Sequence, residues 1–255
     1  MIINYEEIIR KGNDRHYLSK KPQTVCEIFS FEPENMEQMP LGNLYIVTEL
    51  RSVKDCGYLA NLLASLIKRE YYLNPSNGAF KCFQQAVKKA NAHLSEMAKE
   101  EKTEWLSKLH FFCAALTGQN ILFTQAGQMK AYLCRQDHFS CLSRRLNLEG
   151  ESRKGLPSKI FSAIISGPIE QEDKIIIATP EVENIISQTD LRQTLIEKQN
   201  LPEISIKLKA FLQEKNQVPL AILLIKPSKD PDEKIEISPK IKMTTEPIDL
   251  RELLK

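Results

Sequence analysis

The sequence predicts an α+β fold, in which two antiparallel sheets pack face to face with helices on their outer sides. The apolar pattern changes along the chain from strand-like runs to two long helical stretches, then to a meander of short strands, and finally to helices and one last strand. Short turns between neighbouring strands favour antiparallel pairing. The two long helical stretches each have an apolar stripe on one side, as helices that cover a sheet do.

The first half of the chain predicts two strands and two helices. Residues 24–31 alternate apolar and polar side chains, and residues 44–47 are entirely apolar. Residues 55–72 then carry apolar side chains at every third or fourth position, which is typical of an amphipathic helix. Residues 79–99 repeat this pattern, with lysines opposite the apolar stripe. We expect these two helices to lie side by side.

The second half predicts short strands first and then helices. Thr-Gly-Gln-Asn and Ala-Gly-Gln turns separate the strand-like runs. The predicted strands cover residues 109–117, 120–125, 129–135, 139–143, 161–166, 174–178 and 220–225. The predicted helices cover residues 182–187, 190–199 and 204–215. The apolar run LAILLI is the last strand of the predicted compact domain.

Composition divides the chain into three parts. Residues 20–226 contain all the predicted strands and helices and form the predicted compact domain. Beyond Pro227, further prolines and dense charge predict an extended charged tail, residues 227–255. Residues 1–19 precede the first predicted strand and are assigned to an N-terminal extension.

The charge balance argues against two classes of partner. The chain has 35 Lys and Arg against 33 Asp and Glu, a formal net charge of +2, so no broad field attracts nucleic acid or an anionic membrane. No window approaches about 18 uninterrupted apolar residues, and the first residues lack a basic stretch followed by an apolar run. We therefore expect a cytoplasmic chain without a membrane span, whose partner is another protein.

Cysteines and histidines give no metal-binding motif. The six cysteines form no CxxC pair, which argues against a zinc ribbon or a dithiol redox site, and we expect buried free thiols. The four histidines show no HxH or HExxH spacing, so His110 and the others are expected at the surface or at strand ends. No GxSxG, GxxxxGK[ST] or GxGxxG sequence supports a serine hydrolase or a nucleotide-binding loop.

Four stretches resemble motifs of the metal-dependent PPM (type 2C-like) Ser/Thr protein phosphatases, in that family's order. The first three are NLYIVTELRSVKDCGYLANLLASLI at 43–67, NILFTQAGQMKAYLCRQDHFSCLS at 120–143 and FSAIISGPIEQEDKIIIATPEVENIIS at 161–187. The fourth is NQVPLAILLI at 216–225. The resemblance covers about residues 20–226 and implies that family's fold, a four-layer α-β-β-α sandwich of two antiparallel sheets flanked by helices.

The resemblance also implies a metal-dependent reaction whose ligands this chain has largely lost. In the family, aspartates and one glycine carbonyl hold two Mg²⁺ or Mn²⁺ ions, and a metal-bridging water attacks the phosphorus of a phosphoserine or phosphothreonine. Glu49 falls on the first metal-ligating aspartate, and Leu50 falls on the glycine after it. Gln128 replaces the aspartate of the family's Gly-Asp-Ser hairpin. Only Glu49 keeps a carboxylate, one methylene longer.

The remaining positions that the resemblance assigns depart further. Pro180 and Glu181 stand where the family has the Asp-Gly of Thr-Asp-Gly, and the proline side chain offers no donor atom. Asn216 falls on the final aspartate pair, where an amide oxygen coordinates weakly at best. The family's amino-terminal Arg-x-x-Asn-Glu-Asp element has no convincing counterpart near residues 20–25. We therefore predict no catalytic residue, no metal centre and no cofactor.

Three functions stay open from the sequence. The favoured one is a catalytically inactive PPM-type domain, a pseudophosphatase, that acts as a protein-binding or regulatory module. The second is an active metal-dependent Ser/Thr phosphatase, in which Glu49, Glu181, Asn216 and an unidentified amino-terminal acid hold Mg²⁺ or Mn²⁺. The third is an unrelated α/β sandwich with a structural role.

Overall fold

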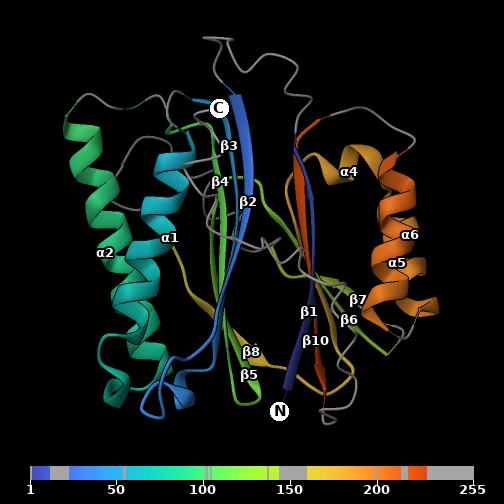
Figure 1. The fold of residues 1–255 in the computed structure, drawn as a ribbon, viewed down its shortest axis with the longest axis horizontal. Helices are drawn as coiled ribbons and strands as arrows, with labels where there is room; N and C mark the ends of the chain where they lie inside the picture. The colour runs from blue at the N-terminus through green and yellow to red at the C-terminus, as the bar shows by residue number, and fades with distance from the viewer. Residues whose placement is uncertain are drawn as a thin grey trace, which may run out of the picture.

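Two antiparallel five-stranded sheets stack on one another, and helices cover the outer face of each sheet (Figure 1). This four-layer arrangement confirms the predicted α+β sandwich. The structure is a computed structural model. It describes residues 2–11, 23–53, 56–100, 103, 105–136, 138–143, 160–198, 200–213 and 218–228.

Sheet B carries the two long helices on its outer face. Its spatial strand order is β2-β3-β4-β5-β8. The strands are β2 (Gln23–Phe31), β3 (Asn43–Val53), β4 (Leu109–Thr117), β5 (Asn120–Ala126) and β8 (Ile165–Pro168). The covering helices are α1 (Cys56–Tyr72) and α2 (Ala79–Lys99), which lie side by side as predicted (Figure 1). Two short 3₁₀ helices are η1 (Met39–Leu41) and η2 (Pro75–Asn77).

Sheet A carries the shorter helices on its own outer face. Its spatial strand order is β1-β10-β9-β6-β7. The strands are β1 (Ile2–Arg10), β10 (Leu220–Ser228), β9 (Lys174–Ala178), β6 (Lys130–Arg135) and β7 (His138–Cys141). The helices are α4 (Val182–Ile185), α5 (Gln188–Glu197) and α6 (Leu201–Gln213).

Three apolar layers hold the sandwich together. Because side chains alternate between the two faces of a strand, β3 directs Val47 into the layer between the sheets and Ile46 into the layer beneath α1 and α2. The strand β10 contributes likewise to two layers, with Leu223 between the sheets and Leu224 beneath the helices of sheet A. All four side chains are fully buried. The interior between the sheets is therefore apolar along most of its length.

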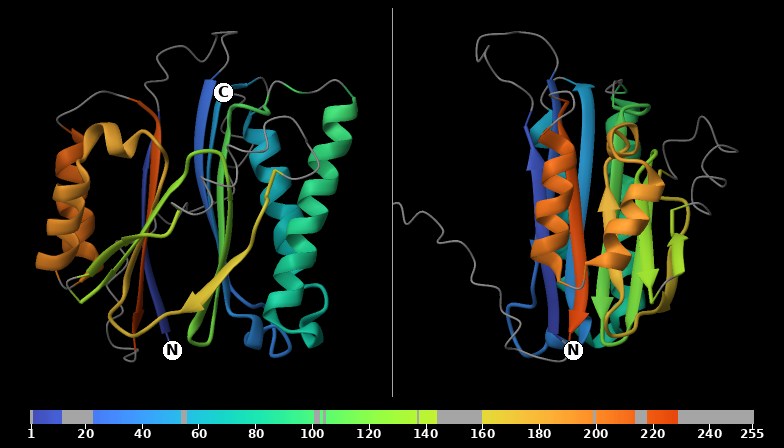
Figure 2. Two further views of the ribbon diagram at one scale, coloured as in Figure 1. Left: turned by 180° about the vertical axis from the view of Figure 1, so that it is seen from behind. Right: turned by 90° about the vertical axis from the view of Figure 1, so that its right-hand side faces the viewer.

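The assignment of residues 1–19 to an extension is wrong for Ile2–Arg10. These residues form β1, which pairs antiparallel with β10 over its whole length, and Ile8 lies opposite Ile222. Figure 2 shows the two strands side by side from two further directions. The strand escaped prediction because adjacent glutamates and doubled isoleucines replace a period of two, as an edge strand with one open side allows. The last strand also extends to Ser228, two residues beyond the predicted end of the domain.

The predicted strand over residues 161–166 is wrong at its start, because the strand β8 begins only at Ile165. Asn91 of α2 holds the preceding segment. Its Oδ1 accepts a hydrogen bond from the Phe161 N–H at 2.9 Å, and its Nδ2 donates to the Phe161 carbonyl at 3.0 Å. The backbone groups that a sheet ladder would use are thus bound to a helix instead.

Two expectations about side chains and spans can be compared with the described residues. Cys26, Cys82, Cys113 and Cys134 are buried, as expected, whereas Cys141 is exposed. In the hairpin of β6 and β7, Cys134 lies opposite Phe139 and Cys141 lies opposite Tyr132. Among the helices that the structure describes, none is long and apolar enough to cross a membrane.

Candidate functional site

The candidate site lies at one end of the sandwich, where the apolar layer between the sheets gives way to charged side chains. The strand β3 extends well beyond the predicted run of residues 44–47 and continues to Val53. Tyr45 and Val47 face the layer between the sheets. Alternation along the strand places Glu49 and Arg51 on this same face. A carboxylate and a guanidinium therefore follow one another along the inner surface of sheet B.

Arg51 connects the two sheets through two carboxylates. Its Nε donates a hydrogen bond to Oε1 of Glu49, and its Nη2 lies 3.0 Å from Oε1 of Glu181. Glu49 belongs to sheet B, whereas Glu181 follows β9 of sheet A. The Glu49 side chain is fully buried, while those of Arg51 and Glu181 are 34% and 25% exposed. The guanidinium thus lies at the edge of the layer between the sheets.

Glu49 is the most constrained charge of this cluster. Burial raises the pKa of its carboxyl, and the Glu181 charge acts in the same direction, whereas the hydrogen bond and charge of Arg51 lower it; the net pKa lies above the ordinary value. Its second oxygen, Oε2, is buried and has no hydrogen-bond partner among the residues that the structure describes. A buried carboxylate with one unsatisfied oxygen depends strongly on its one cation.

His110 lies beside the cluster and is buried rather than at the surface. It is the β4 residue directly opposite Glu49 in the ladder, and only 6% of it is exposed. Its Nδ1 accepts a hydrogen bond from the backbone N–H of Gln128 at 3.0 Å, so the neutral ring carries its proton on Nε2. Burial, and then the charge of Arg51, lower the pKa of His110 to about 4, although Glu181 acts in the opposite sense. The ring is therefore neutral at pH 7.

The turn between β5 and β6 is built around this histidine. Gly127 has a φ of +69°, in the region that favours glycine. A Cβ atom at this position would come within 2.5 Å of both Nδ1 of His110 and the carbonyl oxygen of Leu109. A glycine here lets the turn approach β4 closely enough for the Gln128 N–H to reach the ring.

Of the predicted site residues that the structure describes, two lie together. Glu49 and Glu181 share Arg51. Leu50 points to the opposite face of sheet B, into the apolar layer beneath α1 and α2. The Gln128 side chain is exposed. Pro180 precedes Glu181 in the turn that leads to α4, where its carbonyl accepts from the Glu183 N–H. Asn216 lies outside the described residues.

Sequence reasoning missed Arg51 and gave His110 no role. A signal for Arg51 was available, because side chains two apart on a strand share a face and Glu49 lies two positions earlier. Its second partner, Glu181, lies in the turn after β9 of the other sheet, and no local pattern predicts this contact.

A second polar cluster surrounds Glu183 of α4. Its Oε1 accepts hydrogen bonds from the Tyr132 hydroxyl and from Nε2 of Gln188, and its Oε2 lies 2.8 Å from Nζ of Lys130. Burial raises the pKa of Glu183, but these three donors together outweigh burial and leave the pKa below its ordinary value. Both carboxylate oxygens are engaged, so this cluster ties α4 to β6 and offers no free ligand.

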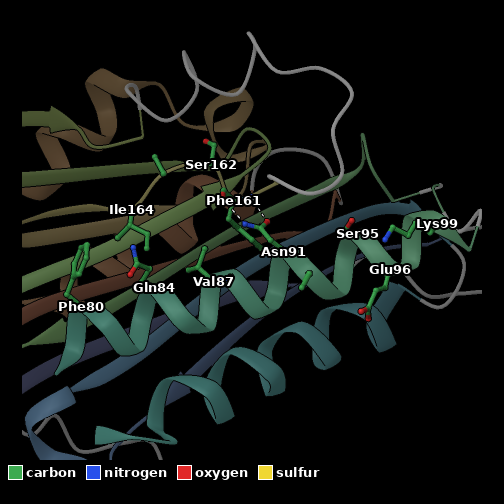
Figure 3. Close-up of a pocket in the computed structure, with 13 residues that line it drawn as sticks. Phe80, Gln84, Val87, Asn91, Ser95, Glu96, Lys99, Phe161, Ser162 and Ile164 are labelled. Carbon is green, nitrogen blue, oxygen red and sulfur yellow. Dashed lines mark hydrogen bonds between the residues drawn. The ribbon is translucent and has the colours of Figure 1, made fainter. Parts of the chain in front are cut away.

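A groove of about 850 Å³ lies elsewhere, on the outer helix layer (Figure 3). The helix α2 lines it with Phe80, Val87 and Asn91, and the segment before β8 lines it with Phe161 and Ile164. Figure 3 shows the paired hydrogen bonds of Asn91 that hold this segment against the helix. Nothing in the described part of the chain indicates what covers the groove, so we assign it no ligand.

Several solved structures share this architecture. One is PppA, a regulatory component of the type VI secretion system in Pseudomonas aeruginosa, with a TM-score of 0.61, 10% identity, and coverage of 89% of this chain and 98% of that one. A second is the catalytic domain of the serine/threonine phosphatase PstP in complex with two manganese ions. Its TM-score is 0.64 and its identity 10%, and the match covers 89% of this chain and 99% of that one. A third is the Staphylococcus aureus serine/threonine phosphatase Stp1. Its TM-score is 0.59 and its identity 11%, and the match covers 90% of this chain and 96% of that one.

These likenesses show that the chain has the PPM phosphatase fold, as the sequence motifs predicted. The sandwich is therefore of the PPM type and is not a different α/β fold. No family model matches the chain, and no curated protein matches it.

The donor set of the described residues does not fit the two divalent ions that the fold implies. Within the described ranges, no three His, Cys, Asp or Glu side chains come close enough to hold a metal ion. Glu49 and Glu181 do converge, but Arg51 lies between them. Mg²⁺ and Mn²⁺ require several oxygen ligands around one centre. We therefore derive no reaction step through a metal.

Proposed function

We propose that this chain is a catalytically inactive PPM-type domain, a pseudophosphatase, which acts as a protein-binding or regulatory module. The observation that carries the proposal is the use of both converging carboxylates, Glu49 and Glu181, by the guanidinium of Arg51. A guanidinium carries charge, but it has no open coordination position at which a water could lose a proton. It therefore cannot supply the nucleophile that phosphoester hydrolysis needs.

The other proposed ligand positions support the same reading. Pro180 has no side-chain donor, and the Gln128 side chain is exposed to solvent. Metal-assisted phosphoryl transfer depends on cations that neutralise charge on the transferred group. The two carboxylates and one guanidinium carry a formal charge of −1, which opposes the approach of a phosphate. We therefore propose no metal, no cofactor and no phosphorylated substrate at this cluster.

One observation favours the alternative, an active phosphatase with atypical ligands. Oε2 of Glu49 is buried without a partner in the described part of the chain, and such an oxygen is free to bind a cation. With Glu181 and Asn216, this oxygen would have to form a site for Mg²⁺ or Mn²⁺.

Metal titration separates the two candidates. We expect no heat when Mn²⁺ or Mg²⁺ is added to the purified protein in a calorimeter, and no turnover of p-nitrophenyl phosphate. The metal-loaded PstP catalytic domain, assayed under the same conditions, is the positive control. Tight binding together with turnover that Glu49→Ala abolishes would establish the active phosphatase and end the pseudophosphatase proposal.

The binding role needs a separate experiment. We propose a protein partner in the cytoplasm, and we expect an interaction screen with the full chain to yield a specific partner that also binds the purified protein. A truncated chain that ends at Ser228 is the matched comparison, because Ser228 is the last residue of β10 and pairs with Ile2. A partner that both chains bind contacts the domain, and one that needs the full chain contacts the tail. If purified candidates all fail to bind, the binding role is wrong.

A further inference from the structure

At the charged end of the sandwich, the Arg51 guanidinium supplies a positive charge from the protein itself. Arg51 lies on sheet B with its first carboxylate partner, Glu49, whereas its second partner, Glu181, lies in the turn after β9 of sheet A. The Glu49 side chain is fully buried and Arg51 is the cation beside it. A carboxylate removed from water needs such a partner, because desolvation of an unpaired charge costs several kcal/mol. The positive charge of Arg51 therefore compensates the desolvation of the Glu49 carboxylate.

The geometry points to an internal counter-ion. We propose that the Arg51 guanidinium occupies the position between Glu49 and Glu181 permanently, ties the two sheets together there, and excludes divalent cations from these carboxylates. The inference deepens the proposed function, on which it rests, because it assigns the loss of metal binding to a residue that fills the site as well as to ligands that are missing.

Removal of the guanidinium should change how the two carboxylates respond to cations. Glu49 would then keep a buried charge with both oxygens unsatisfied, facing Glu181 across the gap. Two converging carboxylates without a cation repel one another and attract a divalent ion or a proton. Removal of Arg51 should therefore destabilise the protein and at the same time create a response to metal that the natural chain lacks.

The test compares thermal unfolding of the natural chain and Arg51→Met at pH 7.5, with and without 10 mM Mn²⁺, a concentration of the order needed to saturate a weak two-carboxylate site. Methionine keeps most of the side-chain length and removes the charge. We expect Arg51→Met to lower Tm by on the order of 10 °C, which is typical of a broken buried pair in a chain of this size. Mn²⁺ should raise the Tm of the variant by about 3–5 °C and leave the natural chain unchanged.

The double variant Glu49→Gln, Arg51→Met is the matched control. It removes both charges, so we expect most of the lost Tm to return and the Mn²⁺ response to disappear. The proposal would be overturned if Arg51→Met cost the same Tm in the natural chain as in a chain that already carries Glu49→Gln. An Arg51→Met protein that ignores Mn²⁺ would overturn it too. If Arg51→Met alone does not fold while the double variant does, that difference itself demonstrates the coupling.

The outcomes also separate this inference from the proposed function. An inert natural chain whose Arg51→Met variant gains no metal response leaves the pseudophosphatase proposal in place and refutes the counter-ion. A natural chain that binds Mn²⁺ and turns over substrate refutes both.

Discussion

Acidification from pH 6.5 to pH 4 should remove up to about 3 kcal/mol of folding free energy through His110 alone. The ring is buried, its Nδ1 accepts the Gln128 N–H, and Arg51 repels a second proton. Protonation in the folded state would require this N–H to turn away from Nδ1. The folded protein therefore resists a proton that the unfolded chain binds readily.

The direction in which pH changes the free energy of unfolding follows from the two pKa values of His110. The pKa of His110 is about 4 in the folded protein and 6.5 in the unfolded chain. Between these values the unfolded chain binds more protons, so the free energy of unfolding rises with pH. The contribution of His110 is complete above pH 6.5 and is lost as the pH falls towards 4. Glu49, whose pKa is raised, acts in the opposite sense, because the folded protein holds its proton more tightly.

Urea unfolding at a series of pH values measures this effect. The comparison is His110→Asn, whose side-chain oxygen can still accept the Gln128 N–H but does not titrate. The difference between the two pH profiles isolates the histidine from Glu49 and the other acids. A difference that stays flat between pH 6.5 and pH 4 would contradict the buried, neutral ring.

Replacement of Gly127 by alanine should destabilise the protein by about 3–5 kcal/mol. The residue has a φ of +69°, and the added Cβ would lie 2.5 Å from both Nδ1 of His110 and the Leu109 carbonyl oxygen. Backbone cannot move aside as the end of a flexible side chain can. The turn would have to withdraw from β4, and the hydrogen bond to His110 would break with it.

Gly118→Ala is the matched control for this prediction. Gly118 also has a positive φ, +57°, in the turn between β4 and β5, but an added Cβ there meets nothing within 4 Å. We expect it to cost only about 1 kcal/mol, the penalty for a side chain in the left-handed region. Denaturant unfolding of both variants separates backbone preference from collision. Equal losses of unfolding free energy in the two variants would show that the close approach of the turn to His110 does not add to the cost of Gly127→Ala.

The long helices and strands with a regular apolar period could be predicted from the sequence, because the pattern that determines them is local. The helix α2 and the strands β4 and β9 begin and end where the apolar pattern predicted. The strand β3 was predicted only over its apolar core of residues 44–47, because its charged continuation resembles a loop when neighbouring strands are unknown. Its pairing with β4 extends at least to Leu50, opposite Leu109, so a partner strand determines its length.

The candidate site was harder to predict because its contacts join distant parts of the chain. The resemblance identified Glu49 and Glu181 as positions of interest, and these two do converge. Their correspondence to metal positions stays a prediction. Alternation along β3 places Arg51 on the same face as Glu49. Its contact with Glu181, however, depends on the distance between the two sheets, which no local pattern encodes. His110 does lie at a strand end, as expected, next to the first residue of β4, but its burial beside the Gly127 turn was not predicted for the same reason.

The position of β10 has a consequence for the order in which the protein can be assembled. It is the last of the described strands along the chain, yet it lies between β1 and β9 in sheet A. During synthesis, β1 emerges first and has no neighbour in its own sheet until residues 220–228 leave the ribosome. Sheet B needs nothing beyond β8. Half of the sandwich can therefore form while the chain still grows, whereas the other half must wait with an open edge that other chains can reach.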